Sequence, residues 1–97
     1  MRRPRGQVKA KDAALPSFSD CKRLDFEIEM GAFLGGTLNE LGKPIKVNEA
    51  WNNIFGFVLF NDWSFRDFQV WEYAPLGPFT AKNGISTISP WIVTVDA

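Results

Sequence analysis

Three acidic residues, Glu27, Glu29 and Asp62, are the candidates for metal binding. The segment LDFEIEMGAF alternates apolar and polar residues, which places Glu27 and Glu29 on one face of a strand, about 6.6 Å apart along the backbone. Like charges at that spacing repel unless a cation compensates them. Asp62 ends a buried apolar run, where a side chain is held firmly. If all three converge, their oxygens favour Mg²⁺ or Ca²⁺, whereas a solvent-facing strand edge and a turn-forming aspartate are the alternatives.

A second group of polar residues follows Asp62. Arg66, Gln69 and Tyr73 recur at i, i+3 and i+7 of a predicted helix, so their polar groups share one face. A guanidinium, an amide and a phenol there are able to hold a carboxylate or a polarised oxygen, although an ordinary hydrated helix face explains them equally well. Lys82 lies in a glycine-containing loop, where a plain surface charge is the alternative.

The elements that must position these residues begin after a loop-like, basic segment over residues 1–20. The alternation predicts a strand over 24–33 with Leu24 and Met30 on its apolar face. A short helix is expected to begin at the cap Asn48 and to stop at Gly56. The apolar run 57–60 then predicts a strand buried on both faces.

A second helix is predicted from residue 65 to about residue 73, because Ser64 and Asp67 form a weak variant of the capping box. A loop over 76–84 and a last strand over 85–95, broken at Pro90, complete the chain. The fold class is therefore α+β, mainly β, with two short helices. The 97 residues allow a single domain, in which 21–97 would form the core that holds the site.

Composition excludes several classes of function. The absence of histidine removes Ser-His-Asp and Cys-His triads and histidine-ligated zinc from this chain. The single cysteine, Cys21, forms no internal disulfide, which favours a reducing, cytoplasmic location. Aromatic residues are not interleaved with basic ones beyond residue 12, so no nucleic-acid partner is expected. No apolar run is long enough to span a bilayer, so no membrane partner is expected either.

Taken together, the motifs resemble those of the fumarylacetoacetate hydrolase family. The resemblance rests on LDFEIEMGAFLG, on IFGFVLFNDWSFRDFQVWEYAPLGPF, on Lys82 and on STISPWIV. The E-x-E strand and N-D-W-S-x-R-D-x-Q are shared across the wider family, while WEY-x-PLGPF and SPW-x-V indicate one branch of it. With RRPRGQ near the start, the resemblance covers essentially all 97 residues.

The resemblance implies part of the family's mixed β-roll, which dimerises in the full-length parent. It implies hydrolysis of a carbon–carbon bond in a small β-diketone acid, 4-fumarylacetoacetate, to fumarate and acetoacetate in tyrosine and phenylalanine catabolism. By this likeness Glu27, Glu29 and Asp62 match ligands of Mg²⁺ or Ca²⁺. Arg66, Gln69 and Lys82 match residues that hold substrate and stabilise developing charge, and Tyr73 matches a substrate contact.

The sequence also departs from the family pattern. A further metal-binding aspartate, the histidine that activates water and a downstream glutamate have no counterpart here. Phe65 replaces a small residue, which could crowd Arg66, and Asn83-Gly84-Ile85 replaces Ser-Phe-Gly. We therefore expect an internal fragment of the catalytic domain, weakly active or inactive alone. The alternatives are a non-catalytic fold remnant or interaction module, and a sibling acylpyruvate hydrolase or decarboxylase.

Overall fold

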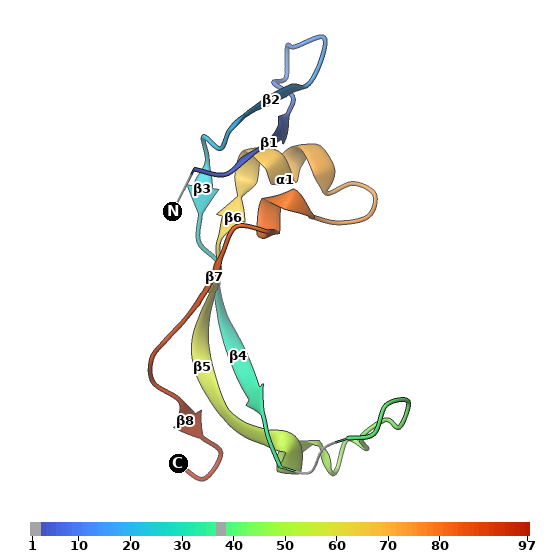
Figure 1. The fold of residues 1–97 in the computed structure, drawn as a ribbon, viewed down its shortest axis with the longest axis vertical. Coiled ribbons are helices and arrows are strands. Elements are labelled where there is room, and N and C mark those ends of the chain that lie inside the picture. The colour runs from blue at the N-terminus through green and yellow to red at the C-terminus, as the bar shows by residue number, and fades with distance from the viewer. Residues whose placement is uncertain (1–2, 37–38) are drawn as a thin grey trace. The chain divides into compact units, whose positions relative to one another are not determined.

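The computed structural model describes residues 3–36 and 39–97, and strands dominate it. The elements, in chain order, are β1 (Arg5–Val8), β2 (Ser17–Asp20), β3 (Leu24–Asp25), β4 (Ile28–Leu34), the 3₁₀ helix η1 (Ala50–Asn53), β5 (Ile54–Asp62), β6 (Ser64–Phe65), α1 (Arg66–Glu72), the 3₁₀ helix η2 (Thr80–Lys82), β7 (Ser86–Ile88) and β8 (Val93–Thr94) (Figure 1). The expected fold class, α+β and mainly β, is confirmed. The chain divides into two compact units, which are Met1–Ile28 with Asn61–Thr87 and Glu29–Phe60 with Ile88–Ala97.

The first unit is built around a small apolar core. Its buried members are Cys21, Phe65, Phe68 and Ala81, against which Val8 packs. The rings of Phe65 and Phe68 meet edge to face, with centroids 5.8 Å apart. Helix α1 lies against β1, where a Cβ at Gly6 would come within 2.9 Å of the Phe68 ring. This core fixes α1 and η2, the two helices that bear Arg66, Gln69 and Lys82.

Residues 1–20 were expected to form a loop. This prediction is wrong for 5–8 and 17–20, which are strands, whereas 9–16 is a loop and residues 1 and 2 lie outside the described residues. Strands β1 and β2 pair antiparallel, with Arg5 opposite Asp20 and Val8 opposite Ser17. Arg5 Nε also forms an ion pair with Asp20 Oδ1 at 3.0 Å. The chain then turns at Cys21, whose buried thiol donates to Asp67 Oδ1 at 3.2 Å, and burial raises the pKa of that thiol.

The strand expected over 24–33 is divided in two. β3 pairs antiparallel with β6, with Leu24 opposite Phe65, and β4 begins only at Ile28. Along this stretch the apolar residues are exposed, with Leu24 at 60% and Met30 at 72%. The alternation therefore identified the residues of each face, but the apolar face is not covered within the described residues.

In the second unit the helix expected after Asn48 is shorter than predicted, because β5 begins at Ile54. The helical part is the single turn η1, which has no side-chain cap, and the chain is extended from Ile54 onward. Gly56 does not stop a helix but pairs with Thr94 of β8, where a Cβ would come within 2.6 Å of the Val93 carbonyl oxygen. Strand pairing overrides the weak local helix signal. The strand over 57–60 is confirmed within β5, but its expected burial on both faces is wrong, because the Leu59 side chain is exposed.

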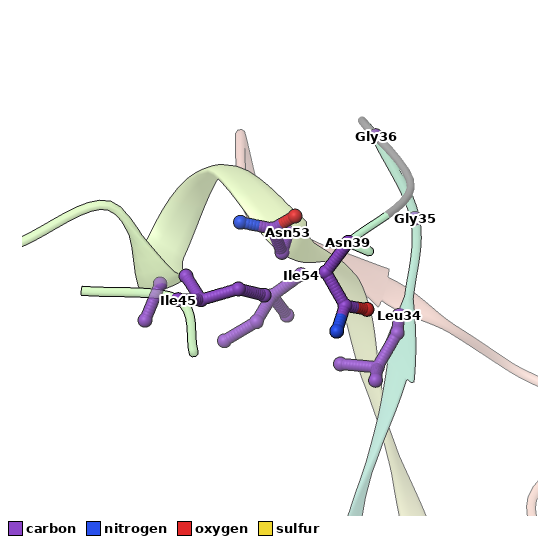
Figure 2. A pocket seen from close by; sticks show the side chains of 8 residues that line it. Leu34, Gly35, Gly36, Asn39, Ile45, Asn53 and Ile54 are labelled. Carbon is purple, nitrogen blue, oxygen red and sulfur yellow. The ribbon is translucent and has the colours of Figure 1, made fainter. Parts of the chain in front are cut away.

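Strand order in the sheet is β4-β5-β7, with β8 also paired to β5. The last predicted strand is broken as expected, since β7 and β8 are separate. Near η1 a pocket of about 310 Å³ is lined by Leu34, Gly35, Gly36, Asn39, Ile45, Ala50, Asn53 and Ile54 (Figure 2). These described lining residues bear no ionisable side chain, so the pocket offers no acid or base. Among the described residues, no helix is long and apolar enough to cross a membrane.

The contact between Phe65 and Gly84 gives a test of the first unit. A Cβ at residue 84 would overlap the Phe65 ring, so Gly84→Ala forces the ring out of its place in the core. We expect Gly84→Ala to lower the free energy of unfolding by about 1–3 kcal/mol, measured by urea denaturation. The neighbouring Asn83→Ala, at an exposed position, is the control and should change little.

In a Phe65→Ala background the clash is absent, so Gly84→Ala should cost much less there than in the wild-type protein. Equal costs in the two backgrounds would contradict the packing described here.

Candidate functional site

Glu27 and Asp62 are brought together by backbone pairing in the first unit. The Asp62 amide donates to the Glu27 carbonyl oxygen at 3.0 Å. The Glu27 amide in turn donates to Asn61 Oδ1 at 3.1 Å. These two hydrogen bonds fix the register of the two segments, so the two carboxylates lie beside each other although they are far apart in the sequence.

The Lys82 ammonium lies against both carboxylates. Its Nζ donates to Glu27 Oε2 at 2.5 Å and to Ser64 Oγ at 2.6 Å, and it forms an ion pair with Asp62 Oδ2 at 2.9 Å. Ser64 is fully buried, and its hydroxyl donates to the Asp62 carbonyl oxygen at 3.0 Å. An ammonium has three N–H groups, so these three oxygens satisfy it. The alternative of a plain surface charge does not fit Lys82, whose side chain is 18% exposed.

Arg66 approaches Glu27 from the start of α1. Its Nη1 donates to Glu27 Oε1 at 2.7 Å and to Gln69 Oε1 at 2.9 Å, and its Nε donates to Asp25 Oδ2 at 2.9 Å. Gln69 is therefore oriented by Arg66, and the two side chains share one face of α1, as the i, i+3 spacing predicted. Both oxygens of Glu27 are thus engaged by cations, Lys82 on one and Arg66 on the other.

The ion pairs shift the pKa of each partner. The hydrogen bond from Lys82 holds the pKa of Glu27 below its ordinary value, and the hydrogen bond from Arg66 does the same for Asp25. Burial opposes the charged form of Lys82, but its hydrogen bonds with Glu27 and Asp62 outweigh burial and raise the pKa of Lys82. The hydrogen bond with Asp25 raises the pKa of Arg66. At neutral pH Asp25, Glu27, Arg66 and Lys82 therefore all carry full charges.

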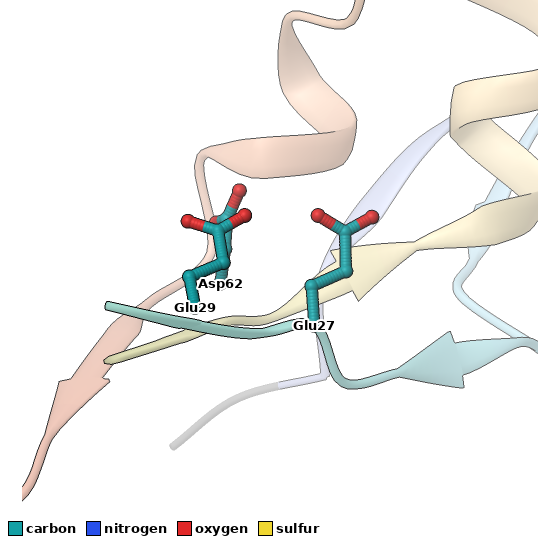
Figure 3. Close-up of side chains that lie close together, drawn as sticks. All are labelled: Glu27, Glu29 and Asp62. Atoms are coloured by element: carbon teal, nitrogen blue, oxygen red, sulfur yellow. The ribbon is translucent and has the colours of Figure 1, made fainter. Parts of the chain in front are cut away.

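The three predicted acidic residues form one group. Carboxylate oxygens of Glu27, Glu29 and Asp62 lie within 4.8 Å of one another, and Glu29 is exposed (Figure 3). Oxygen donors of this kind suit a hard cation such as Mg²⁺ or Ca²⁺. Because each carboxylate oxygen has two lone pairs, the ion pairs with Lys82 and Arg66 do not exhaust what Glu27 and Asp62 can bind.

The polar face of α1 lines a pocket in the first unit. This pocket, of about 400 Å³, is bordered by Arg23, Asp25, Arg66, Gln69, Val70 and Tyr73. The structure thus brings together the predicted group of Arg66, Gln69 and Tyr73. The Tyr73 side chain is half exposed at the edge of the pocket, and Arg66 connects the pocket to the carboxylates through Glu27.

Phe65 and Gly84, which both depart from the family pattern, lie against each other. The Phe65 ring is buried beside Gly84, in the place that a side chain at residue 84 would need. The ring thus points into the core, and Arg66 keeps its partners Asp25 and Glu27. A large residue at position 65 is accommodated because residue 84 is a glycine.

Sequence reasoning missed three residues that hold the site together. Asp25 pairs with Arg66, Asn61 accepts from the Glu27 amide, and Ser64 accepts from Lys82. Ser64 was expected to cap α1, but the structure shows no side-chain cap there. For Asp25 the signal was available, because it shares the polar face of the alternating segment with Glu27.

The sequence of the chain matches the model of one protein family. The family model described as "Fumarylacetoacetate (FAA) hydrolase C-terminal" matches residues 2–97. The match covers almost every residue, so the chain belongs to this family and confirms the resemblance seen in its motifs.

Within this family, the chain is similar to several proteins named fumarylacetoacetase. The chain is 58% identical over 100 residues to a fumarylacetoacetase from Aspergillus fumigatus, 57% over 98 residues to one from Dictyostelium discoideum, and 54% over 97 residues to the human one. Each alignment covers 100% of this chain and 23% of the relative. The chain therefore spans less than a quarter of the length of these curated relatives.

The lowered pKa of Glu27 gives a pH test of the cluster. A carboxylate with a lowered pKa contributes stability that is present above its ordinary value of 4.5 and is lost as the pH falls through the lower, folded-state value. In chelator-treated protein we expect the free energy of unfolding to fall as the pH is lowered below 4.5. Glu27→Gln should make this fall shallower, measured by denaturant titration at each pH.

Glu40→Gln removes one exposed acidic group outside the cluster and is the matched control. If Glu27→Gln and Glu40→Gln gave the same pH dependence, the ion pairs of Glu27 would not contribute to stability as described.

Proposed function

We propose that this chain supplies the carboxylate cluster and the cationic substrate contacts of a fumarylacetoacetase. The proposed reaction is hydrolysis of the carbon–carbon bond of 4-fumarylacetoacetate to fumarate and acetoacetate, in tyrosine and phenylalanine catabolism. The observation that carries the proposal is the meeting of Lys82 and Arg66 on Glu27, next to Asp62 and the α1 pocket. The identity to named fumarylacetoacetases along the whole chain supports the same reaction.

The carboxylates of Glu27, Glu29 and Asp62 are the proposed ligands of Mg²⁺ or Ca²⁺. When bound, the cation supplies Lewis acidity that polarises the oxygens of the diketone. The cation must share Glu27 and Asp62 with Lys82 or replace its ammonium there. The substrate is a small anion, so Arg66, Gln69 and Tyr73 are proposed to bind it in the pocket that they border.

Hydrolysis needs water to add to one carbonyl carbon, after which the carbon–carbon bond breaks and its electron pair leaves with the acetoacetate carbon, which then takes a proton. Arg66 and Lys82 are the donors that we assign to the negative charge developing on the cleaved carbonyl oxygen and the leaving group. Gln69 holds the substrate beside them. The 97 residues contain no histidine, so we assign removal of the water proton to a residue outside them.

Residues 1–97 would form one partial catalytic domain, weakly active or inactive by itself, whose full-length parent acts as a cytoplasmic homodimer. Two other functions are testable alternatives: a sibling chemistry of the same superfamily, as an acylpyruvate hydrolase or a decarboxylase, and a non-catalytic fold remnant or interaction module. The shifted pKa values of Glu27 and Lys82 favour an enzyme, because groups with shifted pKa values gather at catalytic sites.

Calcium titration tests the metal ligands. Glu29 has no ion-pair partner among the described residues, so Glu29→Gln removes a carboxylate without releasing Lys82 or Arg66. In the full natural polypeptide that contains this sequence, Glu29→Gln should weaken Ca²⁺ binding by at least about tenfold, measured by isothermal calorimetry.

Glu40→Gln, which removes an exposed acidic group from an ion pair with Lys43, is the matched control and should keep wild-type affinity. Identical Ca²⁺ affinity in the wild-type and Glu29→Gln proteins would sink the metal assignment.

Activity measurements test the reaction. With Mg²⁺ or Ca²⁺ supplied, the full polypeptide should cleave fumarylacetoacetate, and Lys82→Met should lower kcat by about 10²–10³-fold, the usual effect of removing one donor to a developing oxyanion. The reaction is measured by the decrease in the ultraviolet absorbance of the diketone substrate. Preference for acylpyruvates would instead support the sibling chemistry, and cleavage of neither substrate would overturn the hydrolase assignment.

A further inference from the structure

Glu72, the last residue of α1, reaches across the loop that follows it. Its carboxylate Oε1 accepts from the backbone amide of Phe79 at 2.7 Å and from that of Ala81 at 2.6 Å. The loop between these residues contains Tyr73, whose carbonyl oxygen accepts from the Gly77 amide at 2.6 Å. One side chain thus ties the end of α1 to the start of η2.

These two hydrogen bonds satisfy amides that have no partner in their own helix. The first amides of a helix lack an acceptor within that helix, and Phe79, the residue in the cap position of η2, provides no side-chain cap. A carboxylate suits this place because its hydrogen bonds with the two amides are charge-assisted. Glu72 therefore caps η2 from a distance in sequence.

Lys82 directly follows the residues whose amides Glu72 holds. Lys82 is the last residue of η2, and its amide donates to the Phe79 carbonyl oxygen at 3.0 Å. The preceding Ala81 side chain is fully buried in the core, and the amide of Ala81 is the one held by Glu72. Ala81 is thus held by its amide and by its buried side chain. Because Ala81 is held, the Cα of the next residue, Lys82, is held too, and from there the Lys82 side chain reaches Glu27 and Asp62.

We propose that Glu72 is a positioning residue, which places the Lys82 ammonium by capping η2 and does not touch the substrate itself. This inference rests on the proposed function, in which Lys82 stabilises developing charge. It extends that function by adding a carboxylate whose role is the geometry of a loop and not binding or proton transfer.

Three substitutions in the full natural polypeptide separate geometry from charge. Glu72→Ala removes the acceptor, Glu72→Asp keeps the charge but shortens the reach by one methylene, and Glu72→Gln removes the charge but keeps an oxygen of the same reach. We expect Glu72→Ala and Glu72→Asp to lower kcat by up to about 10²-fold, the cost of displacing a catalytic group by about 1 Å. Glu72→Gln should restore most of kcat, and KM should change less than kcat.

Glu40→Ala, at an exposed glutamate in the second unit, is the matched control and should keep wild-type kcat. The result that distinguishes positioning from general stability is a double-mutant comparison with Lys82→Met. When the ammonium is absent, Glu72→Ala should lower kcat no further, whereas a purely structural role would lower it equally in both backgrounds. The thermal unfolding midpoint of each variant is measured as well, to show whether the variant is still folded at the assay temperature.

Equal loss in the two backgrounds, or wild-type kcat in both Glu72→Ala and Glu72→Asp, would overturn the inference. A wild-type kcat for Lys82→Met would instead overturn the role of Lys82 in the proposed function and the positioning role of Glu72 with it. If Glu72→Ala fails to fold, the comparison of Glu72→Asp with Glu72→Gln still decides, because equal kcat in that pair would contradict a role based on reach.

Discussion

The ion pair between Lys82 and Glu27 is the interaction on which the rest of the site depends. Glu27 and Asp62 lie side by side and partly buried, an arrangement that like charges resist. The ammonium between them removes this repulsion, and two unit charges about 4 Å apart attract by about 4 kcal/mol at an effective dielectric constant of 20. The residues of this cluster lie on or beside short elements of the first unit, which are the paired strands β3 and β6, the start of α1 and the 3₁₀ helix η2.

The core and the site share the same short segments. Ser64, Phe65 and Arg66 are consecutive, and the central one fills the core while its neighbours reach Lys82 and Glu27. Ala81 and Lys82 repeat this arrangement, with a buried residue directly before a charged one. Since packing a buried residue fixes the backbone next to it, the few core contacts also orient the charged side chains.

Local sequence patterns predicted what depends on neighbours along the chain. The alternation around Glu27 and Glu29 and the spacing of Arg66 and Gln69 identified groups that do meet in the structure. The local patterns gave wrong predictions where a residue distant in sequence forms the hydrogen bond or strand pair instead. Ser64 accepts from Lys82 and leaves α1 without a side-chain cap, and Gly56 pairs with Thr94 where a helix stop was expected. The β1–β2 pairing was missed because its strands are short and lie among turn-forming residues.

Lys82 has two roles in the proposed mechanism that pull in opposite directions. In the structure its ammonium stabilises the ionised carboxylates, so the cluster is assembled before any divalent cation arrives. That same ammonium opposes the cation, both by repulsion and by holding oxygens of Glu27 and Asp62. Under the proposed function, a cation would share Glu27 and Asp62 with Lys82 or replace its ammonium there, and any N–H group freed in this way would be able to donate to a substrate oxygen. The ammonium that holds Glu27 ionised would then also be the donor nearest to the charge that develops in the proposed reaction.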